Sequence, residues 1–86
     1  MHNIHDIVVV RITSGARKHR VSRARIQQAL QAQTEAITLP GRGRDPGIAF
    51  LGLDDRGVEL EIVAVVLPGV LLVIHAMPTH YRRDRT

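Results

Sequence analysis

The sequence predicts a small α+β domain in which an N-terminal strand and one helix pack on a three- to four-stranded antiparallel sheet. One helix-like segment follows an apolar, β-branched segment near the N-terminus. Several short apolar segments, separated by turn residues, fill the second half, which is the pattern of an antiparallel meander. With 86 residues, the chain has the length of one domain, and we expect residues 1–86 to form it.

The N-terminal part is expected to begin with a strand and a short turn. Residues 4–12 are rich in Ile and Val, which favour strands, and apolar positions alternate through their second half. Thr13 or Ser14 is then suited to cap a short helical turn that runs through Lys18.

A helix is predicted from Arg23 to about Gln33, with Ser22 as its N-cap. Its apolar stripe is short and is formed by Ile26, Ala29 and Leu30, at positions i, i+3 and i+4. Arg25 lies off this stripe, on a flank of the helix.

Four further strands are predicted at residues 34–39, 48–53, 58–67 and 70–77. The glycine- and proline-rich segment 40–47 separates the first two, and Asp54, Asp55 and Gly57 supply the next turn. A two-residue turn at residues 68–69 pairs Leu67 with Val70 and places His75 opposite Ile62. A shift of one residue would move His75 to the other face of the sheet.

The last two strands carry more apolar surface than one helix can cover. Glu59 and Glu61 alternate with apolar residues, but residues 63–66 and 70–74 are apolar on both faces. Residues 4–12, a second copy of the chain or a different protein must therefore cover the second face. We expect a partner, or a homodimer formed through this apolar face.

Charge and composition favour a polyanion or an acidic protein as partner. The formal net charge is +4, from 12 basic and 8 acidic residues. Cysteine is absent, which excludes disulfides and thiolate metal sites and fits the reducing cytoplasm. We find neither a secretion signal nor a membrane-spanning segment, so a cytoplasmic location without membrane attachment is expected.

Two basic clusters and one histidine are the candidate functional residues. The segment "ARKHRVSRAR" contains Arg17, Lys18, His19, Arg20, Arg23 and Arg25 without an acidic residue. The C-terminal segment contains His80, Tyr81, Arg82, Arg83 and Arg85. Either cluster can bind phosphate, but a solvated helix face and an unstructured tail are the simpler interpretations.

His75 ends an apolar strand, where a histidine either bonds to the backbone or exchanges a proton near neutral pH. Phe50 and Tyr81 are the only large aromatic residues, which argues against a protein that stacks single-stranded bases. The sequence has no convincing metal-ligand spacing, phosphate-binding loop or nucleophile elbow, and no cofactor is expected.

Three stretches resemble the BrnT-type toxins of bacterial toxin–antitoxin pairs, within the RelE/ParE superfamily. Lys18-His19-Arg20-Val21 resembles a Lys-His-Gly-Val element before a helix. The segment "LGLDDRGVELEI" has Gly52, Gly57, Leu60 and Ile62 at matching spacing, and "VIHAMPTHYRR" resembles a final strand that leads into a basic segment. Arg20 stands where the family has glycine, His75 where it has serine, and Met77 where it has arginine.

The resemblance implies a RelE-like fold and a metal-independent endoribonuclease of the mRNA interferase type. Such a toxin cleaves RNA, either free or on the ribosome, and is neutralised by a cognate antitoxin. Attack by the RNA 2′-OH requires a base, an acid and a cationic clamp. The base would be His75 or His19 and the acid Tyr81 or His80, with a phosphate clamp formed by Arg17, Lys18, Arg20, Arg82 and Arg83.

Two other functions remain open at this point. A non-catalytic basic binding module, related to the toxins, would act through protein or nucleic-acid binding and would leave RNA intact. A standalone DNA- or RNA-binding protein would have no toxin role.

Overall fold

The N-terminal strand joins the sheet at one edge. The computed structural model describes residues 9–17, 19–40 and 45–83. They form a small, compact α+β domain with one five-stranded sheet and two α-helices. The elements in chain order are β1 (Val9–Ile12), the 3₁₀ turn η1 (Gly15–Arg17), α1 (Arg23–Gln31), β2 (Gln33–Leu39), β3 (Gly47–Leu53), β4 (Glu59–Leu67), β5 (Val70–Pro78) and α2 (Thr79–Arg83).

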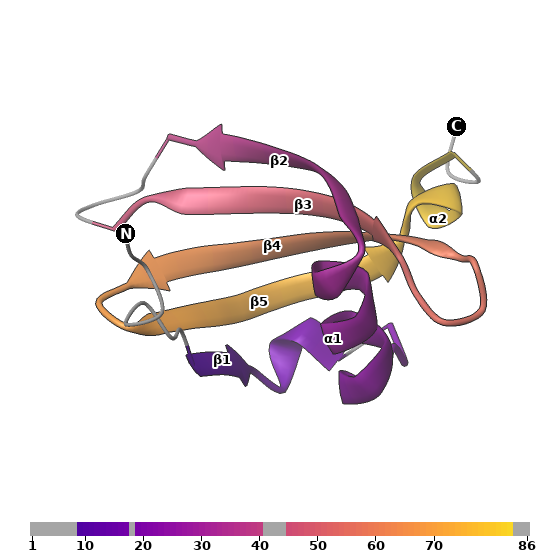
Figure 1. The fold of residues 1–86 in the computed structure, drawn as a ribbon, viewed down its shortest axis with the longest axis horizontal. Coiled ribbons are helices and arrows are strands. Elements are labelled where there is room, and N and C mark those ends of the chain that lie inside the picture. The colour runs from indigo at the N-terminus through magenta and orange to yellow at the C-terminus, as the bar shows by residue number, and fades with distance from the viewer. Residues whose placement is uncertain (1–8, 18, 41–44, 84–86) are drawn as a thin grey trace.

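The sheet is mixed, with the strand order β1-β5-β4-β3-β2 (Figure 1). Strands β2 to β5 form the predicted antiparallel meander, and β1 runs parallel to β5, pairing Val9 with Val70 and Ile12 with Val73. The expectation of a strand packed on a sheet of three or four strands was therefore wrong. A strand laid across a sheet face leaves its backbone polar groups unpaired, whereas β1 hydrogen-bonds to the edge of β5. Residues 4–8 of the predicted strand lie outside the described part.

Helix α1 begins where the sequence predicts and ends two residues earlier. The Ser22 side chain accepts a hydrogen bond from the Arg25 backbone N–H (3.2 Å), as an N-cap does. The helix ends at Gln31 because Gln33 already pairs with Gly52 in the sheet. The short turn after β1 also forms, since the Thr13 hydroxyl accepts from the backbone N–H of the residue three positions on.

The core lies between α1, η1 and one face of the sheet. Ile26 and Ala29 of the predicted stripe are fully buried, whereas Leu30 is only partly buried. Alternate strand residues face them, as the pleat requires. The main buried sheet residues are Phe50, Leu60, Ile62, Ala64, Val73 and Ala76.

The opposite side of the sheet is here called the open face. Neither α1, η1 nor β1 covers it within the described residues, because β1 extends the sheet sideways. Two apolar residues on this face, Ile37 and Leu53, are 56% and 46% exposed. The pairing register assigns to it Val9, Arg11, Glu35, Ile37, Leu39, Ala49, Leu51, Leu53, Glu59, Glu61, Val63, Val65, Leu67, Val70, Leu72, His75 and Met77.

No helix within the described ranges is long and apolar enough to cross a membrane.

Helix α1 approaches the sheet most closely at Gly52. A Cβ atom there would overlap the carbonyl oxygen of Ala29, which belongs to the helix backbone and cannot move away by a rotamer change. We therefore expect Gly52→Ala to lower the free energy of unfolding by about 2–3 kcal/mol. Gly47→Ala is the matched control in the same strand, because its Cβ would make only ordinary contacts, with Leu39 and the Ala64 carbonyl oxygen. Urea denaturation measures both variants, and equal stabilities would contradict the close approach.

Candidate functional site

An irregularity in the β4–β5 pairing decides which face of the sheet carries His75. Leu67 pairs with Val70, as the two-residue turn predicts, but the register shifts between Val63 and Ala64. Ile74 is the extra residue, and His75 therefore pairs with Val63 instead of Ile62. The predicted partner was wrong because a bulge changes the register as a change in turn length does. His75 thus shares the open face with Val63.

Four ring-bearing residues from three separate segments come together at the β5–α2 end of the sheet. The ring centroids of His19 and His75 are 5.7 Å apart, and those of His19 and Tyr81 are 6.1 Å apart. His80 and Tyr81 lie 5.0 Å apart. All three contacts are edge-to-face. We call these four residues the ring cluster, and they are the four acid–base candidates identified from the sequence.

Helix α2 brings two of these rings to the end of β5. Pro78 is buried at the last position of β5, and the next residue, Thr79, begins the helix. The Thr79 hydroxyl donates a hydrogen bond to the Glu59 carboxylate at 2.8 Å. This contact ties the start of α2 to β4, so that His80 and Tyr81 follow at a defined place. The C-terminal segment is helical through Arg83, which rules out an unstructured chain at residues 79–83.

The third segment reaches the cluster through an unusual backbone conformation. Arg20 has a φ of 62°, in the left-handed region that glycine adopts with least strain. Its backbone N–H donates to the Arg17 carbonyl at 3.0 Å, which closes the turn between η1 and α1. Val21 is then buried in the core and anchors the other side of the turn. His19 is held between these two fixed points.

The predicted phosphate clamp is described only in part. Arg17 and Arg20 are exposed and flank His19 in the sequence. Lys18 lies outside the described residues. Arg82 and Arg83 continue α2 directly after Tyr81, but only their backbone is described.

Arg25 of the first basic cluster has a structural partner. Its Nε donates to the Asp54 carboxylate at 2.7 Å, and the side chains are 15% and 0% exposed. The other Asp54 oxygen accepts from the backbone N–H groups of Arg56 and Val58. The turn role predicted for Asp54 is confirmed, and the side chain of Arg25 forms an ion pair with it.

The pKa of Asp54 reflects two opposing effects. Burial raises the pKa, because it disfavours the charged form. The hydrogen bonds from Val58, Arg25 and Arg56 and the charge of Arg25 lower it by more, and the net pKa lies below its ordinary value.

Glu61 is a neighbour of the ring cluster that sequence reasoning missed. It pairs with Met77 on the open face, next to the Val63–His75 pair and diagonal to His75. Long side chains at diagonal positions are within reach of each other. The alternation of Glu59 and Glu61 indicated only a solvated face, and the missing signal was the register of β5.

A hollow of about 540 Å³ lies on the open face, and Glu61 is one of the residues that line it. Its apolar floor is formed by Ile37, Leu39, Ala49 and Leu51. Three carboxylates line it, from Glu35, Glu59 and Glu61. This part of the open face is acidic, in contrast to the basic segments that carry His19 and Tyr81.

The described residues contain no group of three or more His, Asp or Glu side chains close enough to hold a metal ion. The imidazole and phenol groups of the ring cluster can donate and accept protons. Comparisons with protein-family models, with curated proteins and with solved structures found no match to this chain.

The ion pair predicts a pH-dependent stability. Asp54→Asn should lower the free energy of unfolding by about 3 kcal/mol near neutral pH, because it leaves Arg25 unpaired. The folded-state pKa of Asp54 is depressed, so its contribution is present above the unfolded pKa and is lost as pH falls through the folded pKa. Urea titrations should show the variant and the wild type converging in acid. A difference that is constant with pH would contradict this.

For Arg20, whose backbone is left-handed, we predict a substitution that raises the stability of the fold. Arg20→Gly should raise the free energy of unfolding by about 0.5–1 kcal/mol, because it removes backbone strain that exceeds the entropy cost of glycine. Arg23→Gly is the control, because it places glycine in the first turn of α1 and should destabilise. Thermal unfolding compares them, and a destabilised Arg20→Gly protein would contradict the strain.

Proposed function

We propose that the chain is a metal-independent endoribonuclease toxin, BrnT-type within the RelE-like superfamily, that a cognate antitoxin neutralises. The observation that carries this proposal is that His19 meets His75 and Tyr81, which lie more than 50 residues later in the chain, and that His80 lies beside Tyr81. A cluster of side chains that can donate and accept protons is what phosphodiester cleavage by an internal nucleophile requires.

RNA supplies its own nucleophile, so the protein needs only to move protons and to stabilise charge. His75 or His19 removes the proton of the 2′-OH, and the 2′ oxygen attacks the adjacent phosphorus. The bond from phosphorus to the 5′ oxygen breaks, and His80 or Tyr81 donates a proton to that oxygen. The products are a 2′,3′-cyclic phosphate and a 5′-hydroxyl end. Each positioned proton donor or acceptor contributes roughly 10²–10⁴ in rate.

Cations at the cluster stabilise the negative charge that develops on the phosphate. Arg17 and Arg20, exposed on either side of His19, are the described candidates for this role. Arg82 and Arg83 follow Tyr81 directly in α2 and are assigned to the same clamp from the sequence. Lys18 is assigned to the same clamp through the sequence resemblance.

The positions that resemble the toxin family have physical reasons in this fold. Gly57 has a φ of 80°, and Gly52 faces the Ala29 carbonyl without room for a side chain. Arg20 adopts the left-handed conformation at the position where the family carries glycine. These three positions support a RelE-like arrangement, as does the order of a first strand, helical segments and an antiparallel meander.

The open face supports a protein partner. Ile37 and Leu53 are exposed apolar residues on this face, and Ile37 lines the same hollow as Glu35 and Glu61. An antitoxin, or a second copy of the chain, bound there would cover the face that also carries His75. Neutralisation would then follow from blocking access of RNA, free or on the ribosome, to the ring cluster.

The test is induction of the gene alone in a bacterium, with RNA 5′ ends sequenced over time. Wild-type protein should arrest growth and generate new 5′-hydroxyl ends. His19→Ala and His75→Ala should each lower the cleavage rate about 100-fold or more and relieve the arrest. Gln28→Ala, exposed on α1 away from the cluster, is the control and should leave arrest unchanged.

Unchanged arrest in both histidine variants would overturn the assignment of the ring cluster. Intact RNA together with a tight protein complex would instead support the non-catalytic binding module.

A further inference from the structure

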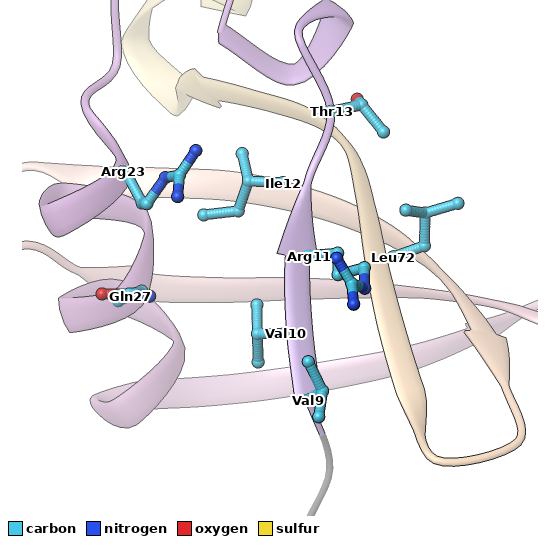
Figure 2. A pocket seen from close by; sticks show the side chains of 8 residues that line it. All are labelled: Val9, Val10, Arg11, Ile12, Thr13, Arg23, Gln27 and Leu72. Atoms are coloured by element: carbon cyan, nitrogen blue, oxygen red, sulfur yellow. The ribbon is translucent and has the colours of Figure 1, made fainter.

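A groove runs between helix α1 and the outer edge of strand β1 (Figure 2). It consists of two adjoining hollows of about 420 and 350 Å³, which share Val10 and Gln27 as lining residues. The larger hollow is lined by every residue of β1 and by Thr13, and the smaller one continues along α1 to Gln31. None of the residues of the ring cluster lines either hollow.

The backbone of β1 offers hydrogen-bonding groups along this groove. The N–H groups of Val9 and Thr13 donate to Gly69 and Val73, on the β5 side. Because strand residues alternate in direction, the N–H and C=O groups of Val10 and Ile12 point to the opposite, outer edge. Among the described strands β1 is the last of the sheet on this side, so no described strand pairs with that edge.

The side chains give the groove an apolar floor and a basic rim. Val10 and Ile12 project toward α1, and Arg23 projects from the helix toward Ile12, while Gln27 lines the same hollow (Figure 2). Arg11 lies on the other side of β1, where its register partner is Leu72. Two guanidinium groups therefore stand on either side of the strand edge, and no carboxylate lines the hollows.

We propose that this groove binds an extended, acidic segment of a partner protein, which pairs with β1 as a sixth strand. The outward N–H and C=O groups of Val10 and Ile12 form backbone hydrogen bonds with the bound segment. Alternate side chains of the segment fall on the two sides of the sheet, where Arg23 and Arg11 bind its carboxylates. Charge complementarity selects an acidic segment, since the lining has two cations and no anion.

A peptide fits this groove better than RNA does. A strand edge presents donors and acceptors at the spacing of another polypeptide strand, whereas unpaired bases need stacking surfaces. None of the lining residues is aromatic. The site also stands apart from the proposed ribonuclease activity, so either proposal can fail without the other.

The first experiment measures binding of fluorescent peptides to the full chain by anisotropy. The panel consists of Val- and Thr-rich peptides with two Glu residues at odd or even separations, so that the carboxylates fall on opposite sides or on the same side of the sheet. A matched panel carries Lys in place of Glu. We expect binding of at least one acidic peptide and at least tenfold weaker binding of its Lys counterpart. In ¹⁵N-labelled protein, the bound peptide should shift the amide signals of Val10 and Ile12. Failure of every acidic peptide to bind, or equal binding of both panels, would overturn the proposal.

Matched variants locate the site. Val10→Pro removes an outward N–H and leaves the ladder to β5 intact, so it should weaken binding at least tenfold. Val10→Ala keeps the N–H and should change affinity by less than about threefold. Arg23→Glu changes an exposed residue and should weaken binding at least tenfold even if Val10→Pro disturbs the fold. Circular dichroism checks that each variant is folded. The proposal would be overturned if Arg23→Glu bound the peptide with unchanged affinity. It would also be overturned if single-stranded RNA at equal concentration displaced the peptide.

Discussion

The contact between α1 and the sheet at Gly52 organises this domain. The helix backbone at Ala29 lies so close to β3 that a side chain has no room between them, and Ile26 fills the core beside this contact. The buried ion pair of Arg25 with Asp54 ties the same helix to the β3–β4 turn. Because a nine-residue helix reaches across only one face, α1 leaves the open face uncovered, and Ile37 and Leu53 are exposed there among the described residues.

The ring cluster depends on three local departures from regular structure. A bulge at Ile74 turns His75 to the open face, and Pro78 ends the strand so that Tyr81 is carried by a new helix. The left-handed conformation of Arg20 turns the chain between His19 and α1. Irregular backbone at a candidate site is consistent with a site that positions groups for chemistry, since each departure lowers stability unless the surrounding structure holds it.

The distribution of charge separates three surfaces. Carboxylates line the hollow on the open face, arginines flank the ring cluster along the chain, and two further arginines border the groove beside β1. The net charge of +4 alone indicates a basic protein without showing which cations are available. Arg25 illustrates the difference, because a buried carboxylate engages it, whereas Arg23, two residues earlier, is exposed at the groove.

Local chemistry in the sequence determined the secondary structure of this protein. Ser22 starts α1, the β-branched segments form strands, and Gly57 and Gly69 take the left-handed positions of the turns, because each depends on neighbours within a few residues. The sequence also identified all four residues of the ring cluster as chemically suitable. Only the tertiary structure decided that β1 joins the sheet beside β5 and that Arg25 forms an ion pair with Asp54. It also decided that the ring of His75 contacts that of His19, and that Glu61 lies on the same face of the sheet as His75. These outcomes follow from the register and packing of segments far apart in the chain, and a single extra residue in β5 reverses the face of a side chain without changing any local preference.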